Sequence, residues 1–225
     1  MLRLHKSAFF YFSLFILLLS SCSNSDTQHL ESKDGFALVT PPKPGEEVAD
    51  FAAGCFWATQ EAMIELKGVH KVISGYAGGT TTNPTYQSVQ TKATGHAEAV
   101  QVYYDPKVIS FEKLVTAFFN AHDPTQVDGQ GPDIGPDYRS IAFYRTPAEY
   151  RAISGVIETV NASKHYPEPI VTEVVPFKAF YPAEMEHQDY YPRNPWNPYI
   201  RNVSKPKILK LRAAFPAMIK PEYLK

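Results

Sequence analysis

The chain has 225 residues, of which 44% are hydrophobic, and 22 Lys and Arg residues stand against 23 Asp and Glu residues for a net charge of -1. This length and composition are enough for one sizeable hydrophobic core. A chain without excess positive charge has no bulk electrostatic attraction to nucleic acid, so we expect no nucleic-acid partner. We expect the folded part to be a monomer.

The first 21 residues have the pattern of an export signal. Two basic residues precede the apolar stretch 8–19, which is short for a membrane span. The sequence Leu19-Ser20-Ser21-Cys22 then resembles a bacterial lipobox, a signal that is cut before its Cys, which is lipidated. An ordinary secretory signal or a short anchor is the alternative. We predict a signal peptide over 1–21, lipidation at Cys22, and a place in the cell envelope, anchored by lipid to a bacterial membrane.

Composition divides the rest of the chain into three parts. Residues 22–45 are polar with three prolines near their end, which predicts a flexible tether. Residues 46–204 contain the regular apolar patterns of a folded domain. Residues 205–225 are a basic tail, whose amphipathic piece 208–215 predicts a helix packed on the surface or, as the lesser alternative, in contact with a membrane surface.

Within the domain, apolar runs and turn signals predict strands and helices in a regular order. Ser110 can cap a helix with apolar residues at helical spacing from Phe111 to Phe119, and Thr146-Pro-Ala-Glu149 is a capping box that starts another helix. The expected strands are 48–53, 69–76, 96–104, 138–144 and 170–175, and the expected helices are 56–67, 86–90 (a short turn or helix), 111–119 and 147–160.

Through residue 144 this order is βαββαβ, the ferredoxin-like split βαβ arrangement. We therefore predict the α+β class: a ferredoxin-like βαββαβ core with an appended helix, an appended strand and an irregular C-terminal wrap over 181–199.

Cys55 lies where the strand 48–53 ends and the helix 56–67 begins, directly after Gly54. Free backbone N–H groups and the helix dipole at such a position favour the thiolate, which is the reactive form of cysteine. The alternative is that Cys55 is a small buried hydrophobe. If Cys22 carries lipid, Cys55 is the only thiol of the mature protein, which excludes an internal disulfide and a Cys-based zinc site.

Glu98 lies on the strand 96–104, where alternation places it on the same face as Val100, Val102 and Tyr104. A carboxyl group on an apolar face has a raised pKa, and a protonated Glu is a good general acid near neutral pH. The alternative is that this face is exposed and that the neighbouring alanines face the core.

Several motifs in this order resemble the peptide methionine sulfoxide reductases of the A class. They run from about residue 48 to 202, nearly all of the folded chain. The matching motifs are Gly54-Cys55-Phe56-Trp57, Gly75-Tyr76-Ala-Gly-Gly79, Asn83-Pro-Thr-Tyr86, Thr94-Gly-His-Ala-Glu-Ala99, Asp133-Ile-Gly135 and Tyr138-Arg139-Ser140.

The resemblance implies a role for each matching residue. Cys55 matches the nucleophile that attacks the sulfoxide sulfur, and Glu98 matches the acid that protonates the sulfoxide oxygen. Tyr86 and Tyr138 match hydroxyl groups that hold this oxygen, and Asp133 matches a carboxylate that supports the surrounding polar network.

The remaining site residues are apolar or C-terminal. Phe56 and Trp57 match the apolar wall that receives the S-methyl group, as a methyl pocket requires. His187, Gln188 and Tyr190 fall in the C-terminal part of the family and are candidates for lining the site.

The family implies thiol-dependent reduction of methionine S-sulfoxide, free or in oxidised envelope proteins, through a Cys55 sulfenic acid, without a metal or an organic cofactor. Many members hold resolving cysteines in the C-terminal segment, and this chain has none after Cys55. We therefore expect the reductant to be an external thiol, from a thioredoxin-like protein or a small molecule. The rival functions are another cysteine enzyme, such as a thiol peroxidase or a Cys–His hydrolase using His96, and a non-catalytic envelope binding module.

Overall fold

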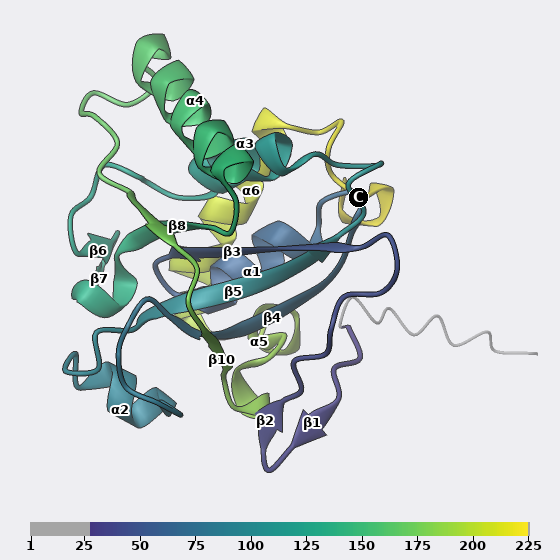
Figure 1. Ribbon diagram of the computed structural model, residues 1–225, viewed down its shortest axis with the longest axis vertical. Coiled ribbons are helices and arrows are strands. Elements are labelled where there is room, and N and C mark those ends of the chain that lie inside the picture. Colours follow the sequence, from purple (N-terminus) through teal and green to yellow (C-terminus); the bar gives the residue numbers. More distant parts are fainter. Residues whose placement is uncertain (1–27, 225) are drawn as a thin grey trace, which may run out of the picture.

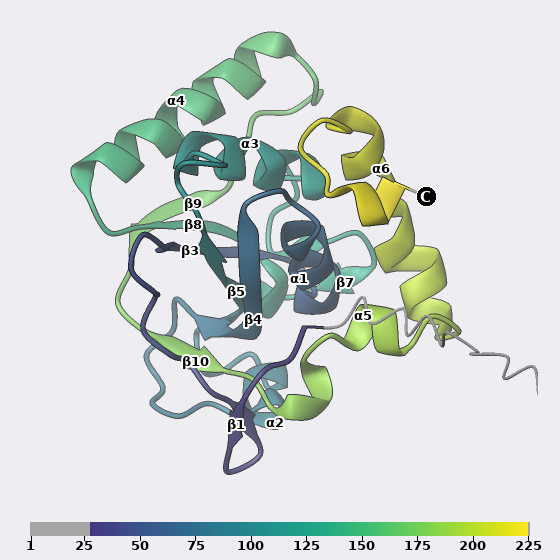
Figure 2. The same ribbon diagram turned by 90° about the vertical axis from the view of Figure 1, so that its right-hand side faces the viewer.

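A six-stranded sheet forms the centre of the structure, a computed structural model that describes residues 28–224 (Figures 1 and 2). The predicted signal peptide and the lipidation site at Cys22 lie outside the described residues. In spatial order the strands are β10 (Phe180–Pro182), β4 (Val69–Ala77), β5 (Ala97–Tyr104), β3 (Glu47–Ala53), β8 (Ser140–Tyr144) and β9 (Glu173–Pro176).

The four strands β4, β5, β3 and β8 form the predicted core. Each is antiparallel to its neighbour, and β5 lies between β3 and β4, which is the strand order of the split βαβ arrangement. The appended helix α4 (Pro147–Ser163) leads from β8 to β9, which pairs with β8 in parallel. The prediction of an α+β fold with a ferredoxin-like core is confirmed.

Helices cover one face of the sheet, above it in Figure 1. Helix α1 (Phe56–Ile64) packs on β4 and β5, and α3 (Phe111–Ala121) packs on β3. The predicted apolar stripe of α3 is buried, and the Phe118 ring stacks on Phe51 of β3 with 4.8 Å between ring centroids. Helix α3 has a local N-cap, because the Ser110 hydroxyl accepts a hydrogen bond from the Lys113 N–H.

Extended chain, and not helix, covers the opposite face. Under the strand-like segment that includes Phe177 and Phe180 the side chains are small: Ala52, Ala77, Ala97 and Ala99. Gly75 shows how closely that segment approaches, because a Cβ atom at this position would lie 2.3 Å from the Tyr181 carbonyl oxygen of β10. Farther along the same face, Ile73 and Tyr103 are buried beneath Ala37 of the N-terminal segment.

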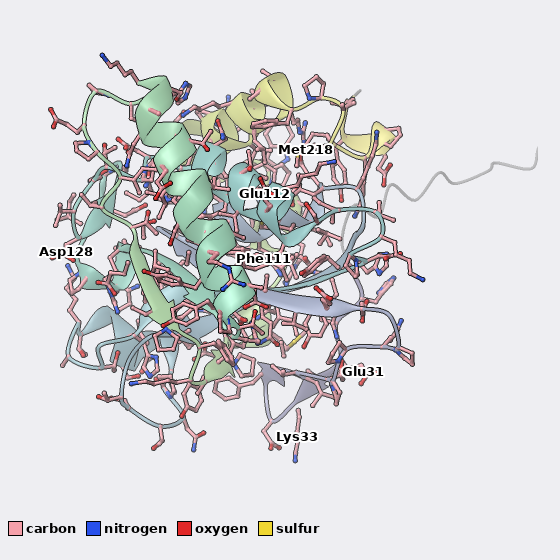
Figure 3. All side chains as sticks on the ribbon, turned by 45° about the horizontal axis from the view of Figure 1, so that its top comes forward. Glu31, Lys33, Phe111, Glu112, Asp128 and Met218 are labelled. Carbon is pink, nitrogen blue, oxygen red and sulfur yellow. The ribbon has the colours of Figure 1, made fainter. Side chains whose placement is uncertain are left out.

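The N-terminal segment corrects the predicted tether over its described residues, 28–45. It forms a hairpin of β1 (Ser32–Lys33) and β2 (Phe36–Ala37), which projects at the bottom of Figure 1, with Glu31 and Lys33 exposed in Figure 3. The side-chain amide of Gln28 hydrogen-bonds both the N–H and the carbonyl of Val72 in β4. Because these bonds satisfy the backbone of the sheet, the segment is part of the domain despite its polar composition.

The C-terminal region has the predicted packed helix, but it corrects the domain boundary at 204. Residues Lys205–Ala214 form helix α6, which packs on α1 and α3, and its Ile208 and Leu211 side chains have no exposed surface. Both guanidinium arms of Arg212 hydrogen-bond the buried Glu65 carboxylate. The domain therefore continues past residue 204.

The remaining elements are short. Tyr138 belongs to a 3-10 turn and not to the strand predicted from residue 138, because Pro136 starts that turn. No helix among residues 28–224 is long and apolar enough to span a membrane. The other short elements are α2 (Tyr86–Gln90), β6 (Gly129–Gln130), β7 (Asp133–Ile134), the 3-10 turns Pro136–Tyr138, Met185–His187 and Pro221–Leu224, α5 (Tyr190–Arg193), and the π-helical turn Ile200–Ser204.

The burial of α6 predicts a stability difference between two leucines of this helix. Leu211→Ala should lower the free energy of unfolding by about 2–5 kcal/mol, because it leaves a cavity in the core. Leu209→Ala is the matched control, since Leu209 is 47% exposed, and its effect should stay within about 0.5 kcal/mol. Urea unfolding of both variants measures the difference. Equal effects would mean that α6 is not part of the core.

Candidate active site

Cys55 lies in a tight connection between β3 and α1. Gly54 makes the turn possible, because its φ of +75° is unfavourable for other residues and a Cβ atom there would lie 2.4 Å from Cβ of Gln130. Cys55 then occupies the N-cap position of α1. The residue is 6% exposed, so the thiol lies below the surface.

Glu98 meets the N-terminus of α1. Its side chain is on the helix-covered face of β5, as alternation predicted, and is 1% exposed, which rules out the alternative of an exposed face. The Phe56 N–H donates a 3.0 Å hydrogen bond to Oε2 of Glu98, and the Gln90 amide donates to Oε1 at 3.2 Å. Burial raises the pKa of Glu98 to about 8, against the lowering effect of the Phe56 N–H.

The protonation of Cys55 differs from the sequence-based prediction. Burial and the nearby Glu98 carboxylate raise the pKa of the thiol well above its usual value. The backbone N–H of Trp57 and the Tyr199 hydroxyl act to lower it. Burial therefore acts in favour of the protonated thiol, against the thiolate that the helix N-terminus was expected to favour. The thiol and Glu98 compete for protons, so a proton can move between them.

Two tyrosine hydroxyl groups lie beside this pair. The Tyr138 hydroxyl accepts a 3.0 Å hydrogen bond from Nε2 of Gln90, the same amide that holds Glu98. Tyr86 begins α2, its backbone N–H bonds Glu184, and burial together with the charges of Glu98 and Cys55 raises its pKa to about 12. Both phenols remain protonated near neutral pH and can donate hydrogen bonds.

Aromatic rings form a wall next to Cys55. The Trp57 ring stacks on Tyr190 at 3.8 Å between centroids, and the His187 ring lies 5.5 Å from Phe56 and 4.2 Å from Tyr86. The wall thus contains four of the five residues predicted to line the site, and Gln188 is the exception. The Gln188 amide instead bonds the backbone of Ser74 in β4, so its role is in the fold.

Tyr199 is a site residue that the sequence analysis missed. Its hydroxyl donates a hydrogen bond to Oδ2 of Asp133 and also interacts with the Cys55 thiol, and its ring packs edge-on against Trp57. This bond places Asp133 next to the site, while its supporting role stays a prediction. Tyr199 lies in a Tyr- and Pro-rich stretch without periodicity, and no local signal separates it from its neighbours.

His96 lies in a different environment. Its Nδ1 accepts a hydrogen bond from the Gly79 N–H at 3.1 Å, so its Nε2 carries the proton and donates to the Thr81 carbonyl at 2.7 Å. Both ring nitrogens are committed to the loop after β4. A Cys–His hydrolase using His96 is therefore not supported.

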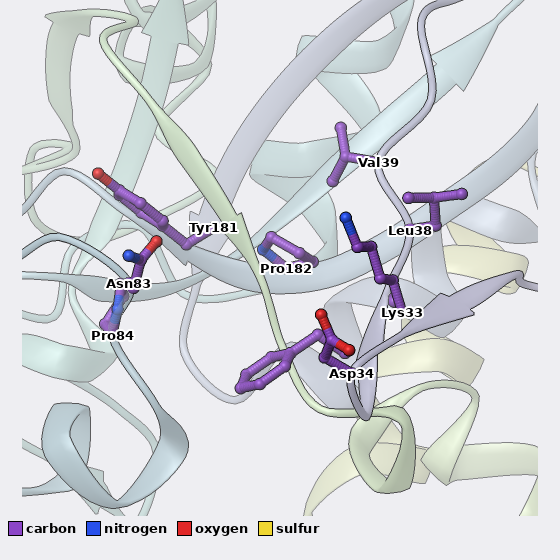
Figure 4. A pocket seen from close by; sticks show the side chains of 10 residues that line it. Lys33, Asp34, Leu38, Val39, Asn83, Pro84, Tyr181 and Pro182 are labelled. Atoms are coloured by element: carbon purple, nitrogen blue, oxygen red, sulfur yellow. The ribbon is translucent and has the colours of Figure 1, made fainter.

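A hollow of about 400 Å³ lies between the N-terminal hairpin, the loop at Asn83 and Pro84, and β10 (Figure 4). None of the predicted site residues lines it. Within residues 28–224 there is also no cluster of three or more His, Cys, Asp or Glu side chains that could hold a metal ion.

Comparison with known proteins matches this geometry. The family model described as peptide methionine sulfoxide reductase matches residues 47–218, which extends beyond the boundary predicted at 204 and includes α6. The chain belongs to this family. It is an oxidoreductase that acts on methionine sulfoxide.

Individual members of the family are similar over most of the chain. The MsrA of Thermus thermophilus is 47% identical over 176 residues, 78% of this chain and 99% of the relative. The MsrA 1 of Rhodopirellula baltica is 46% identical over 83% of this chain and 96% of its own length. Among solved structures, the methionine sulfoxide reductase A of Corynebacterium diphtheriae has a TM-score of 0.64 and 31% identity over 77% of this chain and 91% of its own. Reduced Mxr1 of Saccharomyces cerevisiae has a TM-score of 0.65 and 32% identity over 70% of this chain and 91% of its own.

The contact between Glu98 and the α1 N-terminus predicts the pH dependence of the reductase. The roles expected of the two residues require one proton on the pair, with Glu98 as the acid and Cys55 as the thiolate. Below pH about 8 both groups are protonated, so the single-turnover rate constant for methionine formation should rise with pH through about 8. It should fall again above the pKa of the thiol.

Glu98→Gln should lower this rate constant on the order of 10²–10⁴-fold and remove the rise near pH 8, because the amide has no acidic proton. Glu158→Gln is the matched control, since Glu158 is exposed on α4, and it should leave the profile intact. Rapid-quench measurement of methionine across pH gives both profiles. An unchanged rate and profile in Glu98→Gln would remove Glu98 from the mechanism.

Proposed function

We propose that the protein reduces the S epimer of methionine sulfoxide, free or in oxidised envelope proteins, through a sulfenic acid on Cys55. One observation carries the proposal: the Cys55 thiol, the Glu98 carboxyl group and the Tyr86 and Tyr138 hydroxyls meet beside an aromatic wall. That set provides a nucleophile, an acid and an apolar surface in one place. The restriction to one epimer follows the rule that each enzyme class takes one epimer.

The two sides of the site suit the two ends of a sulfoxide. The rings of Phe56 and Trp57 can receive the S-methyl group, which gains stability from leaving water. The Tyr86 and Tyr138 hydroxyls and protonated Glu98 can donate hydrogen bonds to the oxygen. Because these donors are fixed before the substrate binds, they stabilise negative charge as it develops on that oxygen.

The oxygen transfer then follows in a balanced sequence. The thiol proton moves from Cys55 to Glu98, and the thiolate attacks the sulfoxide sulfur. Glu98 protonates the sulfoxide oxygen as electrons move toward it. The S–O bond of the substrate and the transient bond between the two sulfurs then break as the hydroxyl group passes to the Cys55 sulfur, so sulfoxide and thiol become methionine and a sulfenic acid. The sulfur of the substrate is reduced, and the sulfur of Cys55 is oxidised.

Regeneration must use an external thiol. Cys55 is the only cysteine among the described residues, and Cys22 is the only other one in the chain. An external thiol attacks the sulfenic sulfur, water leaves, and a second thiol reduces the mixed disulfide. We propose a thioredoxin-like protein or a small thiol as donor.

We further propose that the enzyme acts at a bacterial membrane in the cell envelope, held there by lipid on Cys22. The support is the sequence alone: a basic start, a short apolar stretch and the lipobox-like Leu19-Ser20-Ser21-Cys22.

A reductant-free single turnover tests the sulfenic acid. With excess methionine S-sulfoxide the enzyme should release about one methionine per Cys55, because the thiolate is consumed stoichiometrically. Quantifying methionine and trapping the sulfenic acid with a dimedone-type reagent, located by peptide mass spectrometry, measures both products.

The R epimer serves as the substrate control, and Cys55→Ser serves as the protein control; neither should yield methionine. Sustained turnover without thiol, or methionine release without oxidation of Cys55, would contradict the mechanism.

Mass spectrometry of the mature protein tests the anchor. The wild-type N-terminus should be Cys22 carrying acyl chains, and Cys22→Ala should remain unlipidated and keep its signal. Fractionation of the cells should find the wild-type protein with the membranes. A mature N-terminus without acyl mass would show that the lipobox-like sequence is not used.

A further inference from the structure

Lys207, on α6, has a buried and unpaired amine. Its Nζ atom has no contact with solvent and no hydrogen-bond partner. Among residues 28–224 it is the only buried Lys or Arg nitrogen in this condition. A buried ammonium without a partner is costly, so its position needs an explanation.

The charged neighbours of Lys207 belong to the active site. Asp133 and Cys55 are the two groups whose negative charge favours the ammonium, while burial lowers its pKa. Besides burial, the positive charge of Lys207 also acts on His122 and lowers the pKa of that imidazole. The amine therefore lies in the electric field of the reacting sulfur, although it makes no hydrogen bond to it.

The fold holds Lys207 in this place from both sides. Before it, the π-helical turn Ile200–Ser204 follows Tyr199, whose hydroxyl is bonded to Asp133. After it, Arg212 fixes α6 to the Glu65 carboxylate at the end of α1. Helix α1 begins at Cys55, so the helix that carries Lys207 is packed on the helix that carries the thiol. π-helical turns often occur next to functional sites.

Among the described residues, no cation forms a hydrogen bond or an ion pair with Cys55. The negative charges of Glu98 and Asp133 both disfavour a thiolate at Cys55. Two neutral hydrogen-bond donors favour it, the backbone N–H of Trp57 and the Tyr199 hydroxyl. The cations elsewhere near the site are engaged: Lys92 donates to the Ile134 carbonyl, and Arg139 pairs with Glu173.

We infer that Lys207 is a positioning residue for the reaction, whose ammonium supplies the positive charge that stabilises the anionic form of Cys55. The step it assists is the transfer of the thiol proton from Sγ of Cys55 to the Glu98 carboxylate, which creates the thiolate inside the site. Lys207 keeps its own proton throughout. The inference deepens the proposed function, since it concerns the same thiolate, but it can be tested without a sulfoxide.

The test measures the thiolate directly. The full-length protein is alkylated with iodoacetamide, a neutral reagent, across a range of pH, and the Cys55 adduct is quantified by peptide mass spectrometry. The groups that face Cys55 and Lys207 and can titrate are Glu98, Asp133, Tyr86, Tyr199 and His122. They are unchanged in all variants, so a shift of the profile reports the loss of the lysine charge.

Lys207→Met should move the midpoint of alkylation upward by about one pH unit and slow alkylation about tenfold at pH values below the midpoint. Lys207→Arg keeps the charge and should retain most of the wild-type profile. Lys205→Met is the matched control, because Lys205 is exposed on the same helix, and its profile should equal the wild type. Lys207→Gln repeats the neutral substitution with a polar end if Lys207→Met does not fold.

A midpoint in a folded, neutral Lys207 variant that equals the wild type overturns the inference. Equal shifts in Lys207→Met and Lys207→Arg also overturn it, because they would reflect packing and not charge. The proposed function fails separately: a wild-type protein that releases no methionine in the single turnover rejects the reaction, whatever the alkylation profiles show.

Discussion

The hydrogen bond from the Phe56 N–H to the Glu98 carboxylate is the interaction on which the site depends. It joins the first turn of α1 to the middle strand of the split βαβ core, so the residue that precedes the helix and the residue that projects from β5 meet. A carboxyl group in such a dry place is costly, and the free N–H at the helix start is the donor that keeps it there. The same bond uses up part of the helix terminus that would otherwise favour a thiolate, so the fold holds thiol and acid as a pair that shares protons.

The C-terminal quarter of the chain completes this pair although it contains little regular structure. His187 and Tyr190 close the aromatic wall, Tyr199 connects Asp133 to the sulfur, and Lys207 adds a charge. Each comes from a different short element, and α6 keeps them in place through its buried face and the Arg212–Glu65 pair. The sheet and α1 therefore carry the reacting groups, and the C-terminal region carries the residues that surround them.

The features that could be predicted from the sequence are those encoded by local hydrophobic patterns. The succession of strands and helices along the chain and the α3 stripe follow from periodicity and turn signals, and alternation placed Glu98 on the correct face because β5 is a regular strand. The Tyr199–Asp133 contact joins residues 66 positions apart, which no local pattern encodes. The N-terminal hairpin was missed for another reason: its attachment depends on backbone and amide hydrogen bonds, such as those of Gln28, and composition reports only apolar burial. The thiol pKa was mispredicted because burial depends on the whole fold.

The attachment of Gln28 to β4 has a geometric consequence for an enzyme held by its N-terminus. Cys22 precedes Gln28 by six residues, and six residues reach at most about 20 Å even when fully extended. A free tether ending at residue 45 would have allowed about 80 Å over its 23 residues. With lipid on Cys22, the domain would stay within a shallow layer at the membrane surface. Its substrates would then be selected by their height above the bilayer as much as by their chemistry, and membrane proteins with short extramembrane loops would be within reach while distant soluble proteins would have to diffuse to it.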